Sequence, residues 1–255
     1  MVLKTVELKV GDFMTSELIT RDSDVLFPVA ISIMASNSIG NLIIKENNKP
    51  SSLLTEREIL SYLVRRGEIP IEPIRNVLTQ SFTPVSPRMS ILDAAKLMIS
   101  KKKRLLVFEN EKLVGIITAS DMLRGFRKTG GNPSLDKIMS VKVYECAHTD
   151  SIFKAIKLMY QKRIGSVIVT KHGTAYGIFT ERDLLVNVLT QKVALIEKVG
   201  DYCSFPLVTA KIGIRGNDAA RLMASKKIKR LALIEKEKIV GIITARDIVE
   251  AFYAE

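Results

Sequence analysis

The seven residues GIITASD at Gly115–Asp121 occur in related form four times in this chain. The other copies are GIITARD at Gly241–Asp247, GIFTERD at Gly177–Asp183 and the degenerate SLLTERE at Ser52–Glu58. Their threonines stand at positions 55, 118, 180 and 244, so the intervals are 63, 62 and 64 residues. This period is too long for a solenoid repeat, and we expect each copy to be a small unit with several elements of its own.

A second symmetry relates alternate copies. The segment Ile39–Ile44 (IGNLII) matches Ile164–Val169 (IGSVIV) at a shift of 125 residues, which relates repeat 1 to repeat 3. Repeat 2 is related to repeat 4, because 12 of 20 aligned positions are identical between Arg104–Leu123 and Arg230–Val249. The chain therefore has the order A-B-A′-B′. Loop-forming residues at Lys128–Pro133 mark the boundary between its halves.

The same order of elements is predicted in each copy. A short extended stretch, such as Phe82–Val85 or Val141–Cys146, precedes an amphipathic helix and then two apolar runs joined by a polar turn, such as Leu105–Phe108 and Leu113–Ile117. The helix stripes are Ile91, Ala94, Ala95 and Met98 in repeat 2 and Ile152, Ala155, Ile156 and Met159 in repeat 3. A second helix begins at the motif threonine. The unit is β-α-β-β-α, which places the chain in the α/β (α+β) class.

The four repeats are predicted over residues 8–66, 72–127, 134–192 and 197–255. About 60 residues bury too little apolar surface to be stable alone, so we expect repeats to pack in pairs. The chain is 47% hydrophobic, which is enough for a core. It has no signal-peptide pattern and no apolar run of about 18 residues, so a cytoplasmic protein that does not span a membrane is expected.

Composition also restricts the chemistry. Cys146 and Cys203 do not form a disulfide framework and are interpreted as buried small residues. His148 and His172 lack metal-ligand spacing, so no metal site is predicted. The net charge of +12 favours anionic partners, namely nucleotides, nucleic acid or acidic proteins. A lysine-rich surface without such a partner would explain the charge equally well.

The motif turn allows two interpretations. A threonine followed three residues later by an acid is a capping box, which is enough to explain any single copy. Two details favour a ligand instead. Three copies end in aspartate, which we expect to reach back to the threonine amide less well than glutamate and to point outward. Arginine precedes the acid in three copies, and an arginine at a helix N-terminus is typical of anion sites.

The four motifs, their spacing and the β-α-β-β-α order resemble CBS domains (cystathionine-β-synthase domains). The resemblance covers about Val10 to Phe252, and the arrangement is similar to the gamma subunit of AMP-activated protein kinase and to archaeal proteins made only of CBS domains. It implies that consecutive repeats pair into two Bateman modules, each with two clefts for AMP, ADP, ATP or a related adenosyl compound. The adenine nucleotide would be a regulatory ligand, and no catalytic cofactor is implied.

The resemblance also implies roles for individual residues. The ribose hydroxyls would bind Asp121 with Thr118, Asp183 with Thr180, and Asp247 with Thr244. Adenine would contact the partner repeat's second strand, at Ile39, Gly40 and Asn41 for the Asp121 site, Ile164, Gly165 and Ser166 for the Asp247 site, and Leu231 and Ala232 for the Asp183 site. Phosphates would meet basic residues, namely Lys103, Arg104, Arg163, Arg182, Lys229, Arg230 and Arg246.

Two copies depart from the pattern. Repeat 1 has Ser52 in place of glycine and Glu58 in place of aspartate, so Thr55, Arg57 and Glu58 are predicted to form a helix cap and a weak or lost site. Repeat 2 has Ser120 where arginine stands elsewhere, and the Asp121 site is expected to hold less phosphate charge. The second half of the chain, with Asp183 and Asp247, is expected to bind most tightly.

Three function hypotheses remain open. The first is a non-catalytic regulatory module that senses adenine nucleotides and signals to a protein partner encoded elsewhere. No P-loop, nucleophile elbow or zinc signature points to an enzyme. The second is nucleic-acid binding, which 6% aromatic content and the absence of Trp disfavour because stacking platforms are scarce. The third is a scaffold with empty clefts. The sequence does not choose among adenosyl ligands, so S-adenosylmethionine and NAD-type compounds stay open. It also does not decide whether the two modules pack together within one chain or between the two chains of a homodimer.

Overall fold

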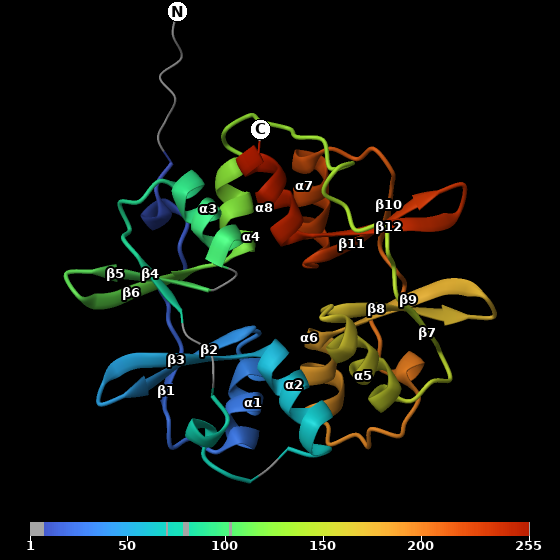
Figure 1. The fold of residues 1–255 in the computed structure, drawn as a ribbon, viewed down its shortest axis with the longest axis horizontal. Coiled ribbons are helices and arrows are strands. Elements are labelled where there is room, and N and C mark those ends of the chain that lie inside the picture. The colour runs from blue at the N-terminus through green and yellow to red at the C-terminus, as the bar shows by residue number, and fades with distance from the viewer. Residues whose placement is uncertain (1–7, 70, 79–81, 102–103, 255) are drawn as a thin grey trace, which may run out of the picture. The chain divides into compact units, whose positions relative to one another are not determined.

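The computed structural model describes residues 8–69, 71–78, 82–101 and 104–254. Within them, the chain forms four units of β-α-β-β-α order, so the predicted fold class is confirmed (Figure 1). The repeats fall into two compact units. Unit 1 holds the sheets and helices of repeats 2 and 4 together with residues 8–18 and the linker up to Lys142, and unit 2 holds the sheets and helices of repeats 1 and 3. The predicted pairing of consecutive repeats would join the two units, and it stays a prediction.

Unit 2 contains the sheets and helices of repeats 1 and 3, together with two short helical turns from the starts of repeats 2 and 4. The elements of repeat 1 are β1 (Thr20–Asp22), α1 (Phe27–Ser36), β2 (Asn41–Glu46), β3 (Lys49–Thr55), α2 (Glu56–Arg66) and the following turn η2 (Ile74–Asn76). Those of repeat 3 are β7 (Glu145–Ala147), α5 (Ile152–Lys162), β8 (Ser166–Lys171), β9 (Thr174–Thr180), α6 (Glu181–Asp183), η3 (Leu184–Leu189) and the turn η4 (Val199–Asp201).

Unit 1 has the corresponding elements of repeats 2 and 4. Repeat 2 contains β4 (Thr83–Val85), α3 (Ile91–Lys101), β5 (Leu105–Glu109), β6 (Lys112–Ile117) and α4 (Ala119–Phe126), and the turn η1 (Val10–Asp12) joins it from the start of the chain. Repeat 4 contains β10 (Thr209–Lys211), α7 (Gly216–Lys226), β11 (Arg230–Glu235), β12 (Lys238–Thr244) and α8 (Ala245–Ala254).

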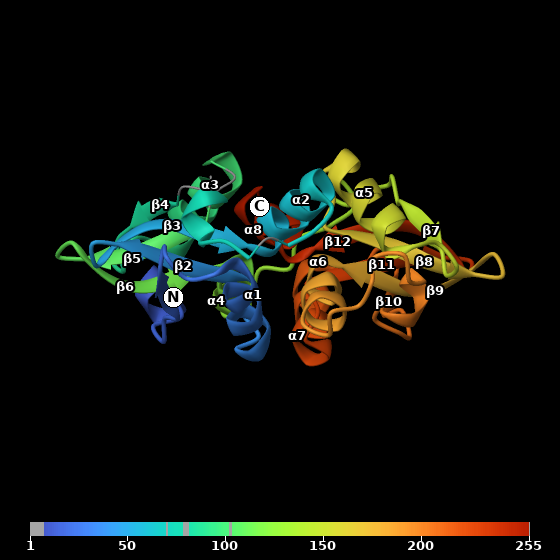
Figure 2. The same ribbon diagram turned by 90° about the horizontal axis from the view of Figure 1, so that it is seen from below.

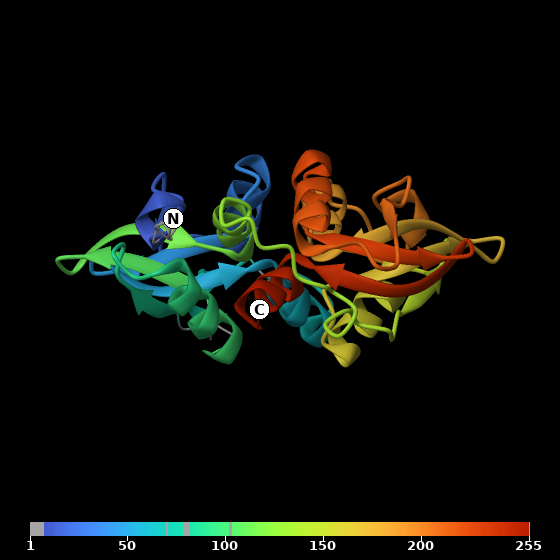
Figure 3. The same cartoon turned by 90° about the horizontal axis from the view of Figure 1, so that it is seen from above.

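Each repeat builds one three-stranded sheet. Its first strand pairs in parallel with the second, across the first helix, and the second pairs in antiparallel with the third. The hairpins turn on two residues of positive φ, as Asn110 (47°) and Glu111 (62°) show, which is the geometry that two-residue hairpins favour. Figures 2 and 3 show the yellow hairpin β8–β9 extending away from the helices of its unit.

The predicted helix stripes are buried. Ile91, Ala94, Ala95 and Met98 line the inner face of α3, and Ile152, Ala155, Ile156 and Met159 line that of α5. In unit 2, α2 packs against α5 and α6, and Leu60 and Leu63 of α2 join the core of repeat 3. In unit 1, α8 packs against α3, α4 and α7, with the rings of Phe126 and Phe252 stacked 5.0 Å apart. The helix faces therefore join alternate repeats.

The linker before each repeat's first strand packs on the preceding or following repeat. Thr15 forms a bridge with Ile116, which brings the start of repeat 1 onto repeat 2. Leu26 forms a bridge with Pro73, which brings the start of repeat 2 onto repeat 1. The same exchange relates repeats 3 and 4, as Ile178 pairs with Ser204 and Ser140 with Ile242. Consecutive repeats thus exchange their first segments, an arrangement that the local sequence pattern did not predict.

Within the described residues, no helix has both the length and the apolar character needed to cross a membrane.

Candidate functional site

The motif turn has the same geometry in all four repeats. In each, the backbone amide of the threonine donates to the carboxylate of the acid three residues later. The N–O distances are 2.9 Å for Thr55–Glu58, 2.8 Å for Thr118–Asp121, 2.8 Å for Thr180–Asp183 and 2.7 Å for Thr244–Asp247. The expectation that aspartate would reach back less well than glutamate was wrong. The first helical turn holds the acid beside the N-cap amide, and one carboxylate oxygen is enough to close the bond.

The repeats differ in the partners of the second carboxylate oxygen of the motif acid, the one that the threonine amide does not hold. In Asp121, Oδ1 lies 2.9 Å from the guanidinium of Arg124, whose Nη2 also donates to the Phe13 carbonyl. In Asp247, Oδ2 is held by the Thr244 amide, and Oδ1 has no hydrogen-bond partner among the residues that the structure describes. The Asp247 side chain is only partly buried, and burial raises the pKa of its carboxyl. Oδ1 of the motif aspartate is therefore an open acceptor in repeat 4, whereas in repeat 2 it is paired with an arginine.

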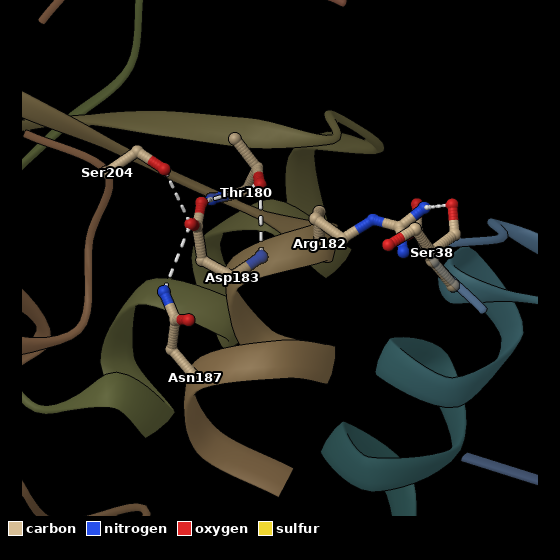
Figure 4. A network of polar contacts seen from close by, with 7 residues as sticks. Ser38, Thr180, Arg182, Asp183, Asn187 and Ser204 are labelled. Carbon is tan, nitrogen blue, oxygen red and sulfur yellow. Dashed lines mark hydrogen bonds and ion pairs between the residues drawn. The ribbon is translucent and has the colours of Figure 1, made fainter. Parts of the chain in front are cut away.

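Asp183 is the most heavily bonded of the three aspartates (Figure 4). Its Oδ2 accepts from the amide and the hydroxyl of Thr180, at 2.8 and 2.6 Å. Its Oδ1 accepts from the Ser204 hydroxyl at 2.7 Å and from Asn187 Nδ2 at 3.3 Å. Asn187 lies in η3, a stretch of π-helix where an ordinary second α-helix was predicted. A ribose at this aspartate would have to compete with Ser204.

The arginines before the acids bridge the repeats of one unit. Arg182 Nε lies 2.8 Å from Glu56, and Arg57 Nε lies 2.7 Å from Glu181, so repeats 1 and 3 exchange two ion pairs. Figure 4 shows Arg182 and Asp183 projecting in opposite directions, toward Ser38 and toward Ser204.

Arg246 has a different set of partners. Its Nη2 donates to the carbonyls of Met98 (2.7 Å) and Ile99 (3.1 Å) near the end of α3, where a cation is favourable. The sequence did not predict these interrepeat contacts, and the phosphate roles of both arginines stay predictions.

The residues predicted to contact adenine lie beside the motif turn of their own repeat. Asn41 pairs in register with Thr55, and Ser166 with Thr180. The amide of Glu181 donates to the Gly165 carbonyl, and that of Glu56 to the Gly40 carbonyl. Ile39 and Ile164 are partly buried, whereas Leu231 and Ala232 are core residues. Their predicted contacts with a ligand of the partner repeat stay predictions.

The basic residues at the start of the second strand differ in exposure. Arg163 is exposed and has left-handed backbone geometry (φ 55°) at the end of α5. Lys229 is exposed, and its carbonyl accepts from the Ala245 amide. Arg104 and Arg230 are partly buried, and Arg230 pairs in register with Thr244. Lys103 lies outside the described residues.

The motif glycines make room for the exchanged linkers. A Cβ on Gly177 would lie 2.6 Å from the Ser204 carbonyl oxygen and 2.9 Å from Cys203 Sγ. A Cβ on Gly115 would lie 2.5 Å from Met14 Sδ. The glycine of the motif is therefore a packing requirement of the linker that crosses the third strand. The sequence shows the spacing between this glycine and the threonine. It does not show the linker residues that the glycine contacts, which lie about 30 residues away for Gly177 and about 100 residues away for Gly115.

The cysteines fit their interpretation as buried thiols only in part. Cys146 is buried, and burial raises its pKa to about 12. Cys203 is partly buried, and burial raises its pKa to about 11. Both are therefore protonated at neutral pH and are poor nucleophiles. Among the residues that the structure describes, no three His, Cys, Asp or Glu side chains are grouped so that they could hold a metal ion.

A family model described as the CBS domain matches this chain at residues 10–65, 74–128, 135–189 and 199–254. The chain belongs to the CBS-domain family. The CBS match covers each β-α-β-β-α repeat together with most of the linker that precedes it.

Relatives from Methanocaldococcus jannaschii are similar over much of the chain. The uncharacterized protein MJ1404 is 27% identical over 262 aligned residues, which cover 94% of this chain and 61% of MJ1404. The uncharacterized protein MJ1225 is 28% identical over 187 residues, which cover 65% of this chain and 66% of MJ1225. This CBS chain thus spans about three fifths to two thirds of the length of these two relatives.

Two solved structures share the fold over nearly the whole chain. The crystal structure of MJ1225, described as a candidate archaeal homologue of γ-AMPK, aligns with a TM-score of 0.82 at 18% identity and covers 96% of this chain and all of the other. An uncharacterized conserved protein from Pyrococcus horikoshii aligns with a TM-score of 0.68, also at 18% identity, with the same coverage. At this identity, the likeness shows the four-CBS fold alone.

Proposed function

We propose that this chain is a non-catalytic regulatory module that binds adenine nucleotides at its motif turns. The observation that carries the proposal is the carboxylate of Asp247. One oxygen is fixed by the Thr244 amide at 2.7 Å, and the other has no partner among the described residues. A carboxylate held in this way can accept hydrogen bonds from a pair of vicinal hydroxyls without moving, which suits a ribose.

The exchanged linkers connect consecutive repeats along the chain. The bridge of Thr15 with Ile116 and the bridge of Leu26 with Pro73 tie repeats 1 and 2 to each other's first segments. Ser204 with Ile178 and Ser140 with Ile242 do the same for repeats 3 and 4. A nucleotide bound at a motif turn would favour the conformations of the chain for which it has the higher affinity, and a partner protein would read the result.

The four turns are proposed to differ in strength. Asp247 would bind most tightly because its outer oxygen is open. Asp183 would bind more weakly because the Ser204 hydroxyl and Asn187 already occupy its Oδ1. Asp121 would compete with Arg124 for the same oxygen. Glu58 closes a capping box in a buried position, so repeat 1 is proposed to hold no ribose.

A titration panel separates the candidate ligands. Isothermal calorimetry with AMP, ATP, S-adenosylmethionine and NAD, each on the purified chain, should show saturable binding of at least one adenosyl compound. An affinity near 1 µM would supply about 8 kcal/mol for a conformational shift. Flat titrations with all four would overturn the proposal in favour of an empty scaffold. Salt-sensitive binding of an oligonucleotide with no adenosyl binding would favour the nucleic-acid hypothesis.

A further inference from the structure

A group of hydrogen bonds fastens the linker before β10, residues 199–208, to the motif turn of repeat 3 (Figure 4). The Ser204 hydroxyl donates to Oδ1 of Asp183 at 2.7 Å, and Asn187 Nδ2 donates to the same oxygen at 3.3 Å. Asn187 Nδ2 also donates to the backbone carbonyl of Tyr202 at 2.9 Å. One amide group therefore bonds both the motif acid and the linker. We call Asp183, Asn187, Tyr202 and Ser204 the linker clasp.

The amide of the clasp is a peculiarity of repeat 3. The residues four positions after the motif acid in repeats 1, 2 and 4 are Tyr62, Gly125 and Ala251. Glycine and alanine have no side-chain donor, and the tyrosine hydroxyl donates to Glu72. Asn187 also lies in the π-helical stretch η3, and such stretches are frequent at functional sites.

The clasp covers an oxygen that is open in repeat 4. Ser140 has the same position on β12 that Ser204 has on β9, yet Oδ1 of Asp247 has no partner among the residues that the structure describes. The Asp183 side chain is buried, with an exposed fraction of 5%. A ribose can therefore reach Oδ1 of Asp183 only after the Ser204 hydroxyl moves aside.

We infer that the linker clasp is a ligand-sensitive fastener, which opens at Tyr202–Ser204 when a ribose takes Oδ1 of Asp183. The trigger rests on the proposed nucleotide binding, whereas the clasp itself needs no ligand. Thr180 already holds Oδ2 of Asp183, so the ribose and the linker compete for Oδ1. A ligand that binds only the open form increases the population of that form. Asn187 is a positioning residue, because it links the acid to the linker backbone.

Cys203 lies within the fastened segment and reports its opening. Its Sγ donates to the Gly200 carbonyl at 3.4 Å, and burial raises the pKa of the thiol to about 11, so it is a poor nucleophile while the linker is closed. Cys146 belongs to the core of repeat 3 and is 6% exposed, so it reacts only when that core opens. The two cysteines separate local opening of the linker from unfolding.

Maleimide labelling at mildly alkaline pH, with each cysteine quantified by peptide mass spectrometry, tests the clasp. Asn187→Ala should label Cys203 roughly tenfold faster and leave the Cys146 rate within about twofold, because only hydrogen bonds that fasten the linker are lost. Asn187→Asp keeps the side-chain shape but places a like charge beside Asp183, so it should label Cys203 at least as fast. The matched control is Thr190→Ala, which removes a bond to the Val186 carbonyl in the same helix and should label like wild type.

Saturating AMP tests the trigger in an Asp247→Ala chain, which lacks the site proposed to be tightest. AMP should accelerate Cys203 labelling several-fold in this chain. The double variant Asp183→Ala/Asp247→Ala should show no such response, because it has no acceptor for which ribose and linker compete. Calorimetry on the same samples measures AMP binding independently of the cysteines.

Several results would overturn the inference. Unchanged Cys203 labelling in Asn187→Ala, equal acceleration of both cysteines, or wild-type labelling in Asn187→Asp would show that there is no clasp. AMP that binds by calorimetry but leaves Cys203 labelling unchanged, or slows it, would overturn the trigger and leave the proposed function standing. A wild-type chain that binds no AMP would overturn the trigger together with AMP binding, whereas faster Cys203 labelling in Asn187→Ala would still support the clasp.

Discussion

Oδ2 of Asp247 lies 2.7 Å from the amide nitrogen of Thr244, whereas Oδ1 of the same carboxylate meets no donor among the described residues. The same inner bond exists in the other three repeats, so it is a feature of the fold and does not by itself mark a site. The outer oxygen is what varies, from an ion pair at Asp121 to hydrogen bonds at Asp183 and an open acceptor at Asp247. The proposal of unequal sites follows from that variation.

The ionisation of Asp247 should be visible in the pH dependence of stability. Burial raises its pKa in the folded state, so between the ordinary value of about 4 and the raised value the folded chain binds more protons than the unfolded chain. Its contribution to stability therefore falls as pH rises through this window and stays low above it. Urea unfolding of wild type and Asp247→Asn should show a relative gain for the variant at pH 7 that shrinks toward pH 4. A difference that grows toward low pH would contradict the raised pKa.

The same ionisation should affect ligand binding. Adenosine affinity should decline as pH falls toward the raised pKa of Asp247, at a higher pH than an ordinary aspartate would require, because the protonated acid accepts fewer hydrogen bonds. Adenosine is the better probe here, since the phosphate of AMP titrates near pH 6. Adenosine affinity that stays constant down to pH 4 would argue against an ionised Asp247 in the complex.

Ser204 should limit binding at Asp183. Removing its hydroxyl with Ser204→Ala frees Oδ1 of Asp183 from a 2.7 Å hydrogen bond, at a cost of about 1 kcal/mol in the free energy of unfolding. We expect calorimetry to show tighter AMP binding or an added site in this variant. Ser140→Ala, at the corresponding linker position on repeat 4, is the control. Weaker binding in Ser204→Ala would show that the hydroxyl contacts the ligand.

Variants of Glu58 in repeat 1 test the helix-capping role of the motif acid separately from ligand binding. Glu58→Ala removes the acceptor of the Thr55 amide in a buried turn and should lower the free energy of unfolding by about 1 to 2 kcal/mol. Glu58→Asp should be much milder, since aspartate closes the same bond in the other repeats. Urea unfolding measures both. A Glu58→Ala chain that unfolds like wild type but loses AMP binding would assign Glu58 to a site.

The motif glycines should respond unequally to alanine. In Gly177→Ala the new Cβ would meet a backbone oxygen at 2.6 Å, whereas in Gly241→Ala its nearest contacts are Met139 Sδ at 3.2 Å and the Ser140 oxygen at 3.3 Å. Overpacking costs typically 1 to 3 kcal/mol, so Gly177→Ala should lower the free energy of unfolding by about 3 kcal/mol and Gly241→Ala by about 1 kcal/mol or less. Equal effects in denaturant titrations would contradict the tight linker crossing at Gly177.

Local periodicity was enough to predict each repeat. The i, i+3, i+4, i+7 stripe from Ile152 to Met159 and the hairpin runs around Asn110 are properties of short segments. Local periodicity did not reveal that Thr15 would pair with Ile116, because nothing near Thr15 encodes a partner about 100 residues away. The arginines show the same limit. The sequence placed Arg182 next to Asp183, but helical geometry separates the two side chains, and Glu56 of repeat 1 determines where the guanidinium lies.

Nucleotide binding at Asp247 is tested most directly by calorimetric titration of AMP into Asp247→Ala. Removal of this carboxylate should weaken AMP binding at the tightest site by about 2 to 3 kcal/mol, roughly 30- to 150-fold in affinity. The folded content of the variant should match that of wild type by circular dichroism, and Asp218→Ala, an exposed acid on α7 of the same repeat, should bind AMP normally. Unchanged AMP affinity and stoichiometry in a folded Asp247→Ala chain would contradict a ribose contact at Asp247.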